Sequence, residues 1–326
     1  MSNSPTLVLI PGAWHKPACY DQIIDLLQGT HKLRCVAVTL PTTFGNRDAT
    51  FKNDIDVVRE AISKETSQGR DVVVVCHSYG GMVGNSAIKG LTKPRDPVVK
   101  SSGNKNKPSQ PSKGYVVGHV LIASGFTMTG LAFMDLFLGH PPPFWRINNE
   151  TGFAEFTADL RQLFYHDLPR DEGEYWVSQI TPQTLKSLFE GGEFAYAGWQ
   201  DVPVWYLGTI DDQANPVAAQ RINVGFAREM GAHVEHRELP ASHSPFLSLP
   251  EETVQILVDA VEAFTGHQVA AARSEVRRAR NKESLPAVRL WQPLTWYKYG
   301  LPYGFGRLVG RGIMIFRWCK SLWRSG

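Results

Sequence analysis

Short apolar segments alternate with helical patterns over the first 266 residues. Helices are expected at residues 21–27, 55–62, 80–88 and 253–264, and strands at residues 6–10, 33–40, 71–76, 116–123, 202–207 and 233–239. The segment 71–76 holds four consecutive valines, which is typical of a parallel strand covered on both faces. This alternation predicts an α/β fold with a doubly wound, mostly parallel sheet.

Three segments depart from this alternation. Residues 93–113 are rich in Lys, Pro, Ser and Asn and predict a flexible loop insert. Residues 128–200 combine aromatic residues with helical spacing and hold no buried strand, which predicts a helical cap over one edge of the sheet. We therefore divide the chain into a core (1–127 and 201–266), a cap (128–200) and a basic, aromatic C-terminal extension (267–326). The extension is expected to begin as a basic helix, after which prolines and glycines break any long amphipathic helix.

The charge of the chain is unevenly distributed. Residues 267–326 hold twelve Lys or Arg and two acids, whereas residues 1–266 hold 22 bases and 29 acids. The acidic body gives no electrostatic argument for a nucleic-acid partner. The interleaved basic and aromatic residues of the extension suit peripheral contact with an anionic membrane, but a disordered extension or a sequence foreign to the fold remain alternatives. The sequence leaves the oligomeric state open.

The cysteines and the hydropathy bear on the location of the protein. The four cysteines are scattered without metal-binding spacing, which argues against a disulfide scaffold or a zinc site and predicts a reducing, cytoplasmic compartment. No stretch of 18 apolar residues occurs, so no spanning helix is expected. The first apolar run is too short for a signal peptide and follows no basic residue.

Ser78 carries the strongest chemical pattern in the chain. It follows the valine-rich strand in the string Cys76-His77-Ser78-Tyr79-Gly80-Gly81 and precedes a predicted helix. This is the arrangement of a nucleophile elbow, in which a tight turn lifts the serine above the sheet and requires small neighbours two residues away. Gly80 meets that requirement, and Cys76 is small enough to meet it. The alternative is a serine that merely caps the helix.

A serine nucleophile needs a base that is oriented by an acid. His243 follows the strand at 233–239 in a small polar loop, and both Asp211 and Asp212 follow the strand at 202–207. All three therefore lie at the carboxyl ends of strands, where sites in α/β sheets gather. His233 and His236 could suggest a metal, but Glu235 and His236 point to opposite faces of a strand. We expect no metal and no organic cofactor.

Four strings in this order resemble the α/β-hydrolase superfamily. The closer likeness is to its small-cap branch, which includes plant methylesterases, hydroxynitrile lyases and uncharacterised fungal and bacterial hydrolases. The strings are Pro11-Gly12-Ala13-Trp14-His15, the elbow at 76–81, Tyr206-Leu207 followed by Asp212 to Pro216, and Ser242-His243-Ser244-Pro245. Two positions depart from the pattern of the branch, because Pro11 replaces a histidine and Cys76 replaces a glycine.

The resemblance implies a role for each matching position. Ser78 would be the nucleophile, His243 the base and Asp212 the acid, since the Asp-x-x-x-Pro register favours Asp212 over Asp211. The oxyanion hole would use the N–H groups of Ala13 and Tyr79. The residues expected to bind substrate are Gly12, Trp14, Phe126, Tyr165 and Trp176.

The resemblance implies a serine hydrolase that cleaves a carboxylic ester, lactone or thioester of a small apolar molecule. Two alternatives belong to the same fold, namely a lyase and a catalytically idle ligand-binding protein. The lyases of the branch carry a lysine after the catalytic histidine and a threonine in place of Gly12, whereas this chain has Ser244 after His243. These differences favour hydrolysis.

Overall fold

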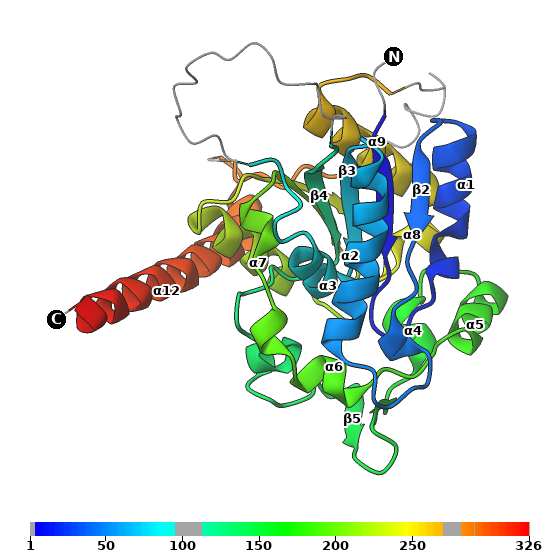
Figure 1. Cartoon of the computed structure of the whole chain (residues 1–326), viewed down its shortest axis with the longest axis horizontal. Helices are drawn as coiled ribbons and strands as arrows, with labels where there is room; N and C mark the ends of the chain where they lie inside the picture. Colours follow the sequence, from blue (N-terminus) through cyan, green and yellow to red (C-terminus); the bar gives the residue numbers. More distant parts are fainter. Residues whose placement is uncertain (1–3, 95–112, 270–281, 290, 326) are drawn as a thin grey trace, which may run out of the picture.

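The computed structural model describes residues 4–94, 113–269, 282–289 and 291–325. Its centre is a six-stranded parallel sheet in the order β2-β1-β3-β4-β7-β8 (Figure 1). The strands are β1 (Thr6–Ile10), β2 (Arg34–Ala37), β3 (Val72–His77), β4 (Val116–Ile122), β7 (Val204–Thr209) and β8 (Val234–Leu239). The predicted doubly wound sheet is confirmed.

Helices cover both faces of this sheet. On one face, α1 (Asp21–Gly29) packs against α9 (Pro250–Thr265), and α9 also contacts β4. On the other face, α2 (Phe51–Ser67) packs against α3 (Gly80–Ala87), and α7 (Val217–Glu229) contacts β7 and β8 (Figure 1). Because all six strands are parallel, their carboxyl ends meet at one edge, which is where a site is expected.

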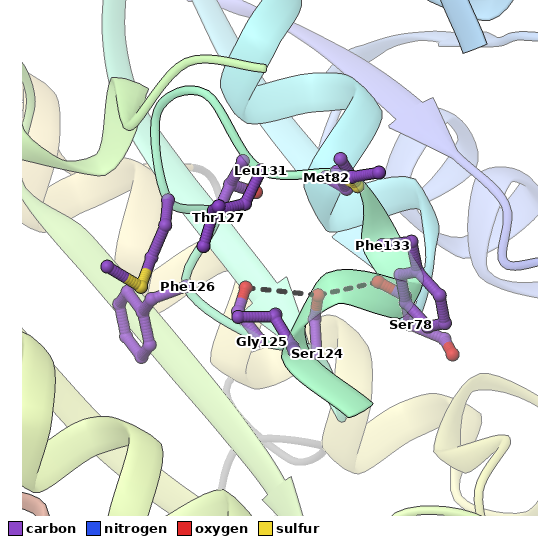
Figure 2. A pocket seen from close by; sticks show the side chains of 11 residues that line it. Ser78, Met82, Ser124, Gly125, Phe126, Thr127, Leu131 and Phe133 are labelled. Carbon is purple, nitrogen blue, oxygen red and sulfur yellow. Dashed lines mark hydrogen bonds between the residues drawn. The ribbon is translucent and has the colours of Figure 1, made fainter. Parts of the chain in front are cut away.

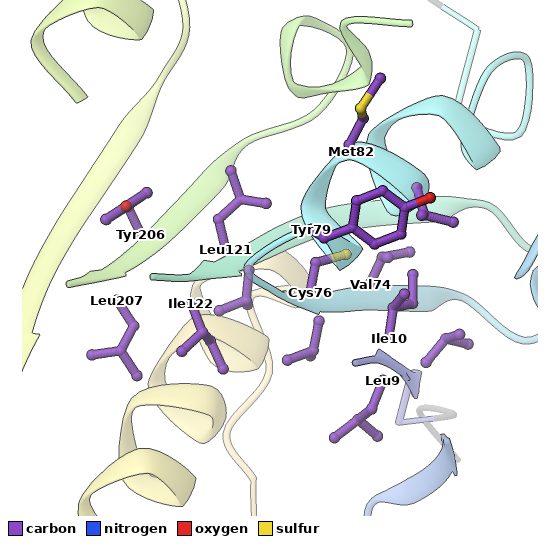
Figure 3. Close-up of a cluster of buried hydrophobic side chains, with 14 of the residues drawn as sticks. Leu9, Ile10, Val74, Cys76, Tyr79, Met82, Leu121, Ile122, Tyr206 and Leu207 are labelled. Carbon is purple, nitrogen blue, oxygen red and sulfur yellow. The ribbon is translucent and has the colours of Figure 1, made fainter. Parts of the chain in front are cut away.

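The valines of β3 form the centre of the hydrophobic core. Val72 to Val75 are fully buried, because β1 and β4 flank the strand in the sheet and helices cover it on both faces. Figure 3 shows the side chains of β1, β3, β4 and β7 gathered in this cluster. The close packing extends to Gly118, where an added Cβ would lie 2.1 Å from the ring of Phe264 on α9.

The segment 128–200 contains short helices, as expected, together with a two-stranded antiparallel sheet. The sheet pairs β5 (Trp145–Asn148) with β6 (Phe153–Phe156). The turn between them is encoded locally, since the Asn148 side chain accepts hydrogen bonds from the N–H groups of Glu150 and Thr151, and Gly152 has a φ of +82°. The longer helices are α4 (Leu160–Phe164), α5 (Arg170–Ser178) and α6 (Leu185–Phe189).

The C-terminal extension corrects one expectation from the sequence. Prolines and glycines were expected to break any long helix, but α12 (Leu301–Ser325) runs for 25 residues after α11 (Pro293–Thr295) and η6 (Trp296–Gly300). Pro302 lies just after the π-helical turn η6, and the carbonyl of Lys298, four residues before it, accepts a hydrogen bond from Arg221 instead. Gly306 lies against α7, where an added Cβ would be 2.0 Å from the carbonyl oxygen of Ile222. Packing on α7 therefore offsets the weak helical preference of these residues.

Some expectations fall on residues outside the description. The predicted loop at 93–113 lies mostly within 95–112, and the basic helix expected at the start of the extension lies within 270–281. In the described ranges, no helix is both long and apolar enough to cross a membrane. The four cysteines carry free thiols.

A buried carboxylate joins the sheet to α2. The side chain of Glu65 is 2% exposed and accepts hydrogen bonds from Arg70, from Arg34 on β2 and from Thr6 on β1. Burial opposes ionisation of this carboxyl, but the hydrogen bonds from the two arginines and the threonine outweigh it. They lower the pKa of Glu65 from 4.5 to about 2.

We expect Glu65→Gln to destabilise the protein and to change its pH dependence. Because the pKa is depressed in the folded chain, the stabilisation is present above pH 4.5 and is lost as the pH falls toward 2. The substitution should lower the free energy of unfolding at neutral pH by about 3 kcal/mol. The free energy of unfolding, measured by urea unfolding at several pH values, should also fall less steeply below pH 4.5 in Glu65→Gln than in the wild type. Glu60→Gln, at an exposed position of the same helix, should keep the wild-type pH dependence. A wild-type pH dependence in Glu65→Gln would contradict this account.

Candidate active site

Ser78 lies in a strained turn between β3 and α3. Its φ is +49°, a left-handed value that side chains rarely adopt. The turn brings the start of α3 against the end of β1, so that a Cβ added to Gly80 would lie 2.4 Å from the carbonyl oxygen of Pro11. Ser124, after β4, donates a hydrogen bond to the Ser78 carbonyl at 2.6 Å. The geometry is that of a nucleophile elbow, with the serine half-buried at the carboxyl edge of the sheet.

The structure explains how cysteine is accommodated two residues before Ser78. The Cys76 side chain is fully buried in the central cluster (Figure 3). Its thiol faces Gly84 on α3, where an added Cβ would lie 2.2 Å from Sγ. Burial raises the pKa of the Cys76 thiol well above its ordinary value, so the thiol stays protonated. Because Gly84 has no side chain, it leaves space for the Cys76 thiol, which a glycine at position 76 would not need.

The two candidate acids occupy different environments. The Asp212 side chain is buried, and its Oδ2 accepts hydrogen bonds from His243 Nδ1 at 2.8 Å and Thr209 Oγ1 at 2.7 Å. Its Oδ1 accepts from the backbone N–H groups of the next loop residues, Ala214 and Asn215. Asp211 is exposed. The structure therefore brings Asp212, and not Asp211, to the histidine.

His243 is held from both the core and the cap. Its backbone carbonyl accepts a hydrogen bond from His77 Nε2 at 2.9 Å. The N–H of the preceding residue, Ser242, donates a hydrogen bond to Asp167 Oδ2 at 2.8 Å, and its Oγ donates one to the Phe164 carbonyl. These contacts fix the loop after β8. Because Nδ1 donates to Asp212, Nε2 is the nitrogen left to act on other groups.

His77 is a neutral positioning residue next to Ser78. Burial lowers its pKa well below the ordinary value, and the neighbouring histidines His243 and His15 lower it further. A neutral ring that donates from Nε2 carries no proton on Nδ1. The hydrogen bond to the His243 carbonyl gives His77 a positioning role that the sequence did not reveal.

The loop after β1 lies beside the serine. A Cβ added to Gly12 would be 3.1 Å from Ser78 Cβ and 2.9 Å from the ring of His77, so only glycine fits there. The next loop residues are fixed by the cap: Trp14, with a φ of +64°, donates its N–H to Gln183 Oε1 at 3.2 Å. Its carbonyl accepts from both the N–H and the hydroxyl of Thr181.

His15 fastens the same loop to the cap. Burial lowers its pKa to about 4, so the ring is neutral at physiological pH. Nδ1 donates to the Ala13 carbonyl at 2.7 Å, and Nε2 accepts from the Tyr165 hydroxyl at 2.8 Å. The N–H groups of Trp14 and His15 are used within the protein, whereas that of Ala13 has no protein acceptor in the described ranges.

A buried chain of hydrogen bonds connects the Trp14 loop to Tyr79. Gln183, which holds Trp14, also donates to Thr42 Oγ1 at 3.0 Å, and Thr42 donates to Asp54 Oδ2 at 2.6 Å. The Tyr79 hydroxyl donates to the same oxygen at 2.9 Å. Burial raises the pKa of Asp54 to about 6, against the hydrogen bonds from Thr42 and Tyr79. Sequence reasoning missed this chain, because its members lie far apart along the sequence.

A small apolar cavity opens beside Ser78 (Figure 2). Its volume is about 40 Å³, and most of its wall comes from the segment after β4. The lining side chains include Met82, Phe126, Thr127, Met128, Leu131 and Phe133. Of the residues expected to bind substrate, Phe126 lines the cavity and Gly12 borders Ser78. Trp14, Tyr165 and Trp176 do not line it, because Trp14 faces an outer groove, Tyr165 holds His15, and Trp176 lies on α5.

Comparisons with known proteins give the family. Residues 7–256 match the model of the alpha/beta hydrolase family. The chain belongs to this family. The hydrolase is 26% identical over 265 residues to an alpha/beta hydrolase of Aspergillus novofumigatus, a match that covers 78% of this chain and 96% of that protein. In the described ranges, no group of three or more His, Cys, Asp or Glu side chains could hold a metal.

Two further comparisons give a second sequence relative and a neighbour in fold. The hydrolase is 24% identical over 289 residues to a pyrethroid hydrolase of Sphingobium wenxiniae, covering 82% of this chain and 91% of that protein. A methylesterase from Arabidopsis superposes with a TM-score of 0.59 at 16% identity, covering 79% of this chain and 99% of that one. The second likeness concerns the fold alone. The predicted resemblance to the superfamily is confirmed.

The contact between Cys76 and Gly84 can be tested by exchange. Alanine usually stabilises a helix relative to glycine by about 0.5–1 kcal/mol. Gly84→Ala should instead destabilise the hydrolase by about 1–3 kcal/mol, because its Cβ would overlap the Cys76 thiol. The double variant Cys76→Ala/Gly84→Ala should recover most of the lost unfolding free energy in urea unfolding. The methyl group of the alanine at position 84 would then occupy the space that the Cys76 sulfur has left.

Gly29→Ala on α1 serves as the control, because an added Cβ there meets no atom within 4 Å. Strictly additive effects of Cys76→Ala and Gly84→Ala would show that the two positions do not share this space.

Proposed function

We propose that this hydrolase cleaves a carboxylic ester, lactone or thioester of a small apolar substrate through Ser78, His243 and Asp212. The observation that carries the proposal is the buried hydrogen bond from His243 Nδ1 to Asp212. It selects the tautomer in which Nε2 can accept a proton, and it occurs in a chain whose serine sits in a nucleophile elbow. No other serine in the described chain has this combination of backbone and neighbours.

In the proposed first step, Ser78 Oγ attacks the carbonyl carbon while His243 Nε2 takes the hydroxyl proton. The carbonyl oxygen becomes an oxyanion, which the N–H groups of Tyr79 and Ala13 would stabilise. The intermediate collapses, the bond to the leaving oxygen or sulfur breaks, and His243 gives its proton to the leaving group. Water then attacks the acyl-enzyme by the same steps, releasing the acid and restoring Ser78.

The surroundings of each group support its role. Gly12 lets the backbone of the loop after β1 lie next to Ser78, and the Gln183-Thr42-Asp54 chain joins this loop to Tyr79. Preorganised donors of this kind stabilise a developing oxyanion without having to move during the reaction. The neutral His77 keeps a second positive charge away from His243.

The cavity supports a small apolar group on the substrate. Its wall is aromatic and aliphatic, and its volume admits only a short acyl or alcohol portion. The fold neighbour named as a methylesterase supports an ester rather than the other two bonds. The lyases of the small-cap branch carry a lysine directly after the catalytic histidine. This chain has Ser244 at that position, which disfavours a lyase.

We expect wild-type protein to turn over short p-nitrophenyl esters and Ser78→Ala to lose that activity. Asp212→Asn should lower kcat by about 10⁴-fold, because an amide would stabilise the wrong tautomer of His243. Asp211→Asn should retain wild-type turnover, since Asp211 is exposed beside the same loop. Turnover measured by absorbance for the four proteins gives the comparison.

The melting temperature of each variant and labelling by a fluorophosphonate complete this test. Loss of turnover in Ser78→Ala at an unchanged melting temperature, together with loss of labelling, supports the nucleophile. A folded wild type that neither turns over esters nor reacts with the fluorophosphonate would remove the hydrolase assignment in favour of a ligand-binding protein.

The cavity size predicts a chain-length preference. The wild type should hydrolyse p-nitrophenyl acetate with a higher kcat/KM than p-nitrophenyl octanoate. Leu131→Ala should raise the octanoate-to-acetate ratio of kcat/KM by about tenfold, because removing part of the lining side chain enlarges the cavity. Leu138→Ala, in the same segment but 85% exposed and outside the lining, is the matched control. An equal shift in both variants would assign the preference to another part of the molecule.

A further inference from the structure

The helix α12 packs against the body through one face only. Gly306 and Gly310, one turn apart, lie against α7, and Cβ atoms added there would approach the Ile222 carbonyl and the Glu229 side chain. On the other side of the contact, Gly225 of α7 lies against the backbone of Tyr303. Three glycines thus allow the two helices to approach closely and fix the rotation of α12 about its axis.

The opposite face of α12 is apolar and exposed. Residues spaced three and four apart fall on one side of a helix, and the apolar stripe is rotated away from Gly306 and Gly310. The exposed members of the stripe are Leu301, Phe305, Leu308, Val309, Ile315 and Phe316. Figure 1 shows α12 extending from the body beside α7, so that its last turns lie away from the sheet and the cap.

This helix is anchored to the core. Ser284 and Glu238 exchange two backbone hydrogen bonds, which add the extension to the edge of the sheet at β8. His236 on β8 hydrogen-bonds the Tyr303 hydroxyl at 2.7 Å, and Arg221 on α7 donates to the Lys298 carbonyl at 3.1 Å. The apolar stripe is therefore held outward by a fixed attachment.

The charge of this region complements an anionic surface. Residues 285–326 contain seven Lys or Arg and no acid. Among them, Lys298 and Arg307 are exposed, and exposed aromatic residues at Trp291, Trp296 and Tyr297 precede α12. Basic residues beside exposed aliphatic and aromatic side chains are the composition of helices that lie at the interface of anionic membranes.

We propose that α12, with residues 291–300, docks this protein on the surface of an anionic lipid bilayer. The apolar stripe enters the region of the headgroups, and the basic residues meet the lipid phosphates and carboxylates. A second copy of the chain fits this face poorly, because pairing would bring the six positive charges of residues 291–325 against six. The proposal is independent of the esterase chemistry.

The test is flotation of the purified full chain with vesicles. Protein should float with vesicles that mix phosphatidylserine with phosphatidylcholine, remain behind with phosphatidylcholine alone, and be released at high salt. Phe316→Ser and Arg307→Glu should each lower the bound fraction by about tenfold at limiting lipid. Both positions are exposed, so the melting temperature should not change.

Two matched controls sharpen the comparison. Phe44→Ser removes a phenylalanine that is 67% exposed, against 66% for Phe316, and Lys64→Glu reverses an exposed charge on α2. Both should float like wild type. Equal losses in the controls, or equal flotation with neutral vesicles, would overturn the proposal. The proposal would also be overturned by a stable dimer in solution that dissociates in Phe316→Ser. Tighter binding to single-stranded RNA than to the anionic vesicles would overturn it as well.

Discussion

The absence of a side chain at Gly80 is the constraint from which the site follows. The start of α3 meets the end of β1 so closely that a methyl group would overlap the Pro11 carbonyl. This contact holds Ser78 in its left-handed conformation, which a serine would not adopt by itself. The loop after β1 also lies beside Ser78, since a Cβ added to Gly12 would be 3.1 Å from Ser78 Cβ. The parallel strand order then adds Asp212 and His243 from β7 and β8 at the same edge.

A second level of organisation joins the core to the cap. The cap supplies Gln183, which completes a buried chain through Thr42 and Asp54 to Tyr79. A buried carboxyl is costly unless its hydrogen bonds are made, so the cap and the core stabilise each other at this point. The cap also holds the loops of Trp14 and His243 by direct hydrogen bonds. It therefore acts on the geometry of the site.

Local chemistry explains what the sequence could predict. The valine run, the elbow and the Asp-x-x-x-Pro register each depend on residues close along the chain, and the fold and the placement of Asp212 beside His243 agree with them. The Gln183-Thr42-Asp54 chain spans the sequence, and no local pattern marks those residues. For α12, local preference pointed the wrong way, because its glycines weaken an isolated helix but allow close packing on α7. Trp14 and Tyr165 were expected to bind substrate from the resemblance, and the structure adds that the Trp14 backbone and the Tyr165 hydroxyl hold loops.

The cavity wall comes mainly from one connection, the segment that leaves β4, whereas Ser78, Asp212 and His243 come from three other connections. Under the proposed function, selectivity and chemistry are thereby encoded mainly in separate stretches of the gene. Beyond Ser124, which holds the Ser78 carbonyl, substitutions in the β4 connection can accumulate after a gene duplication without removing a contact to the serine, the histidine or the acid. A lineage carrying this architecture can explore new substrates while its reaction stays the same.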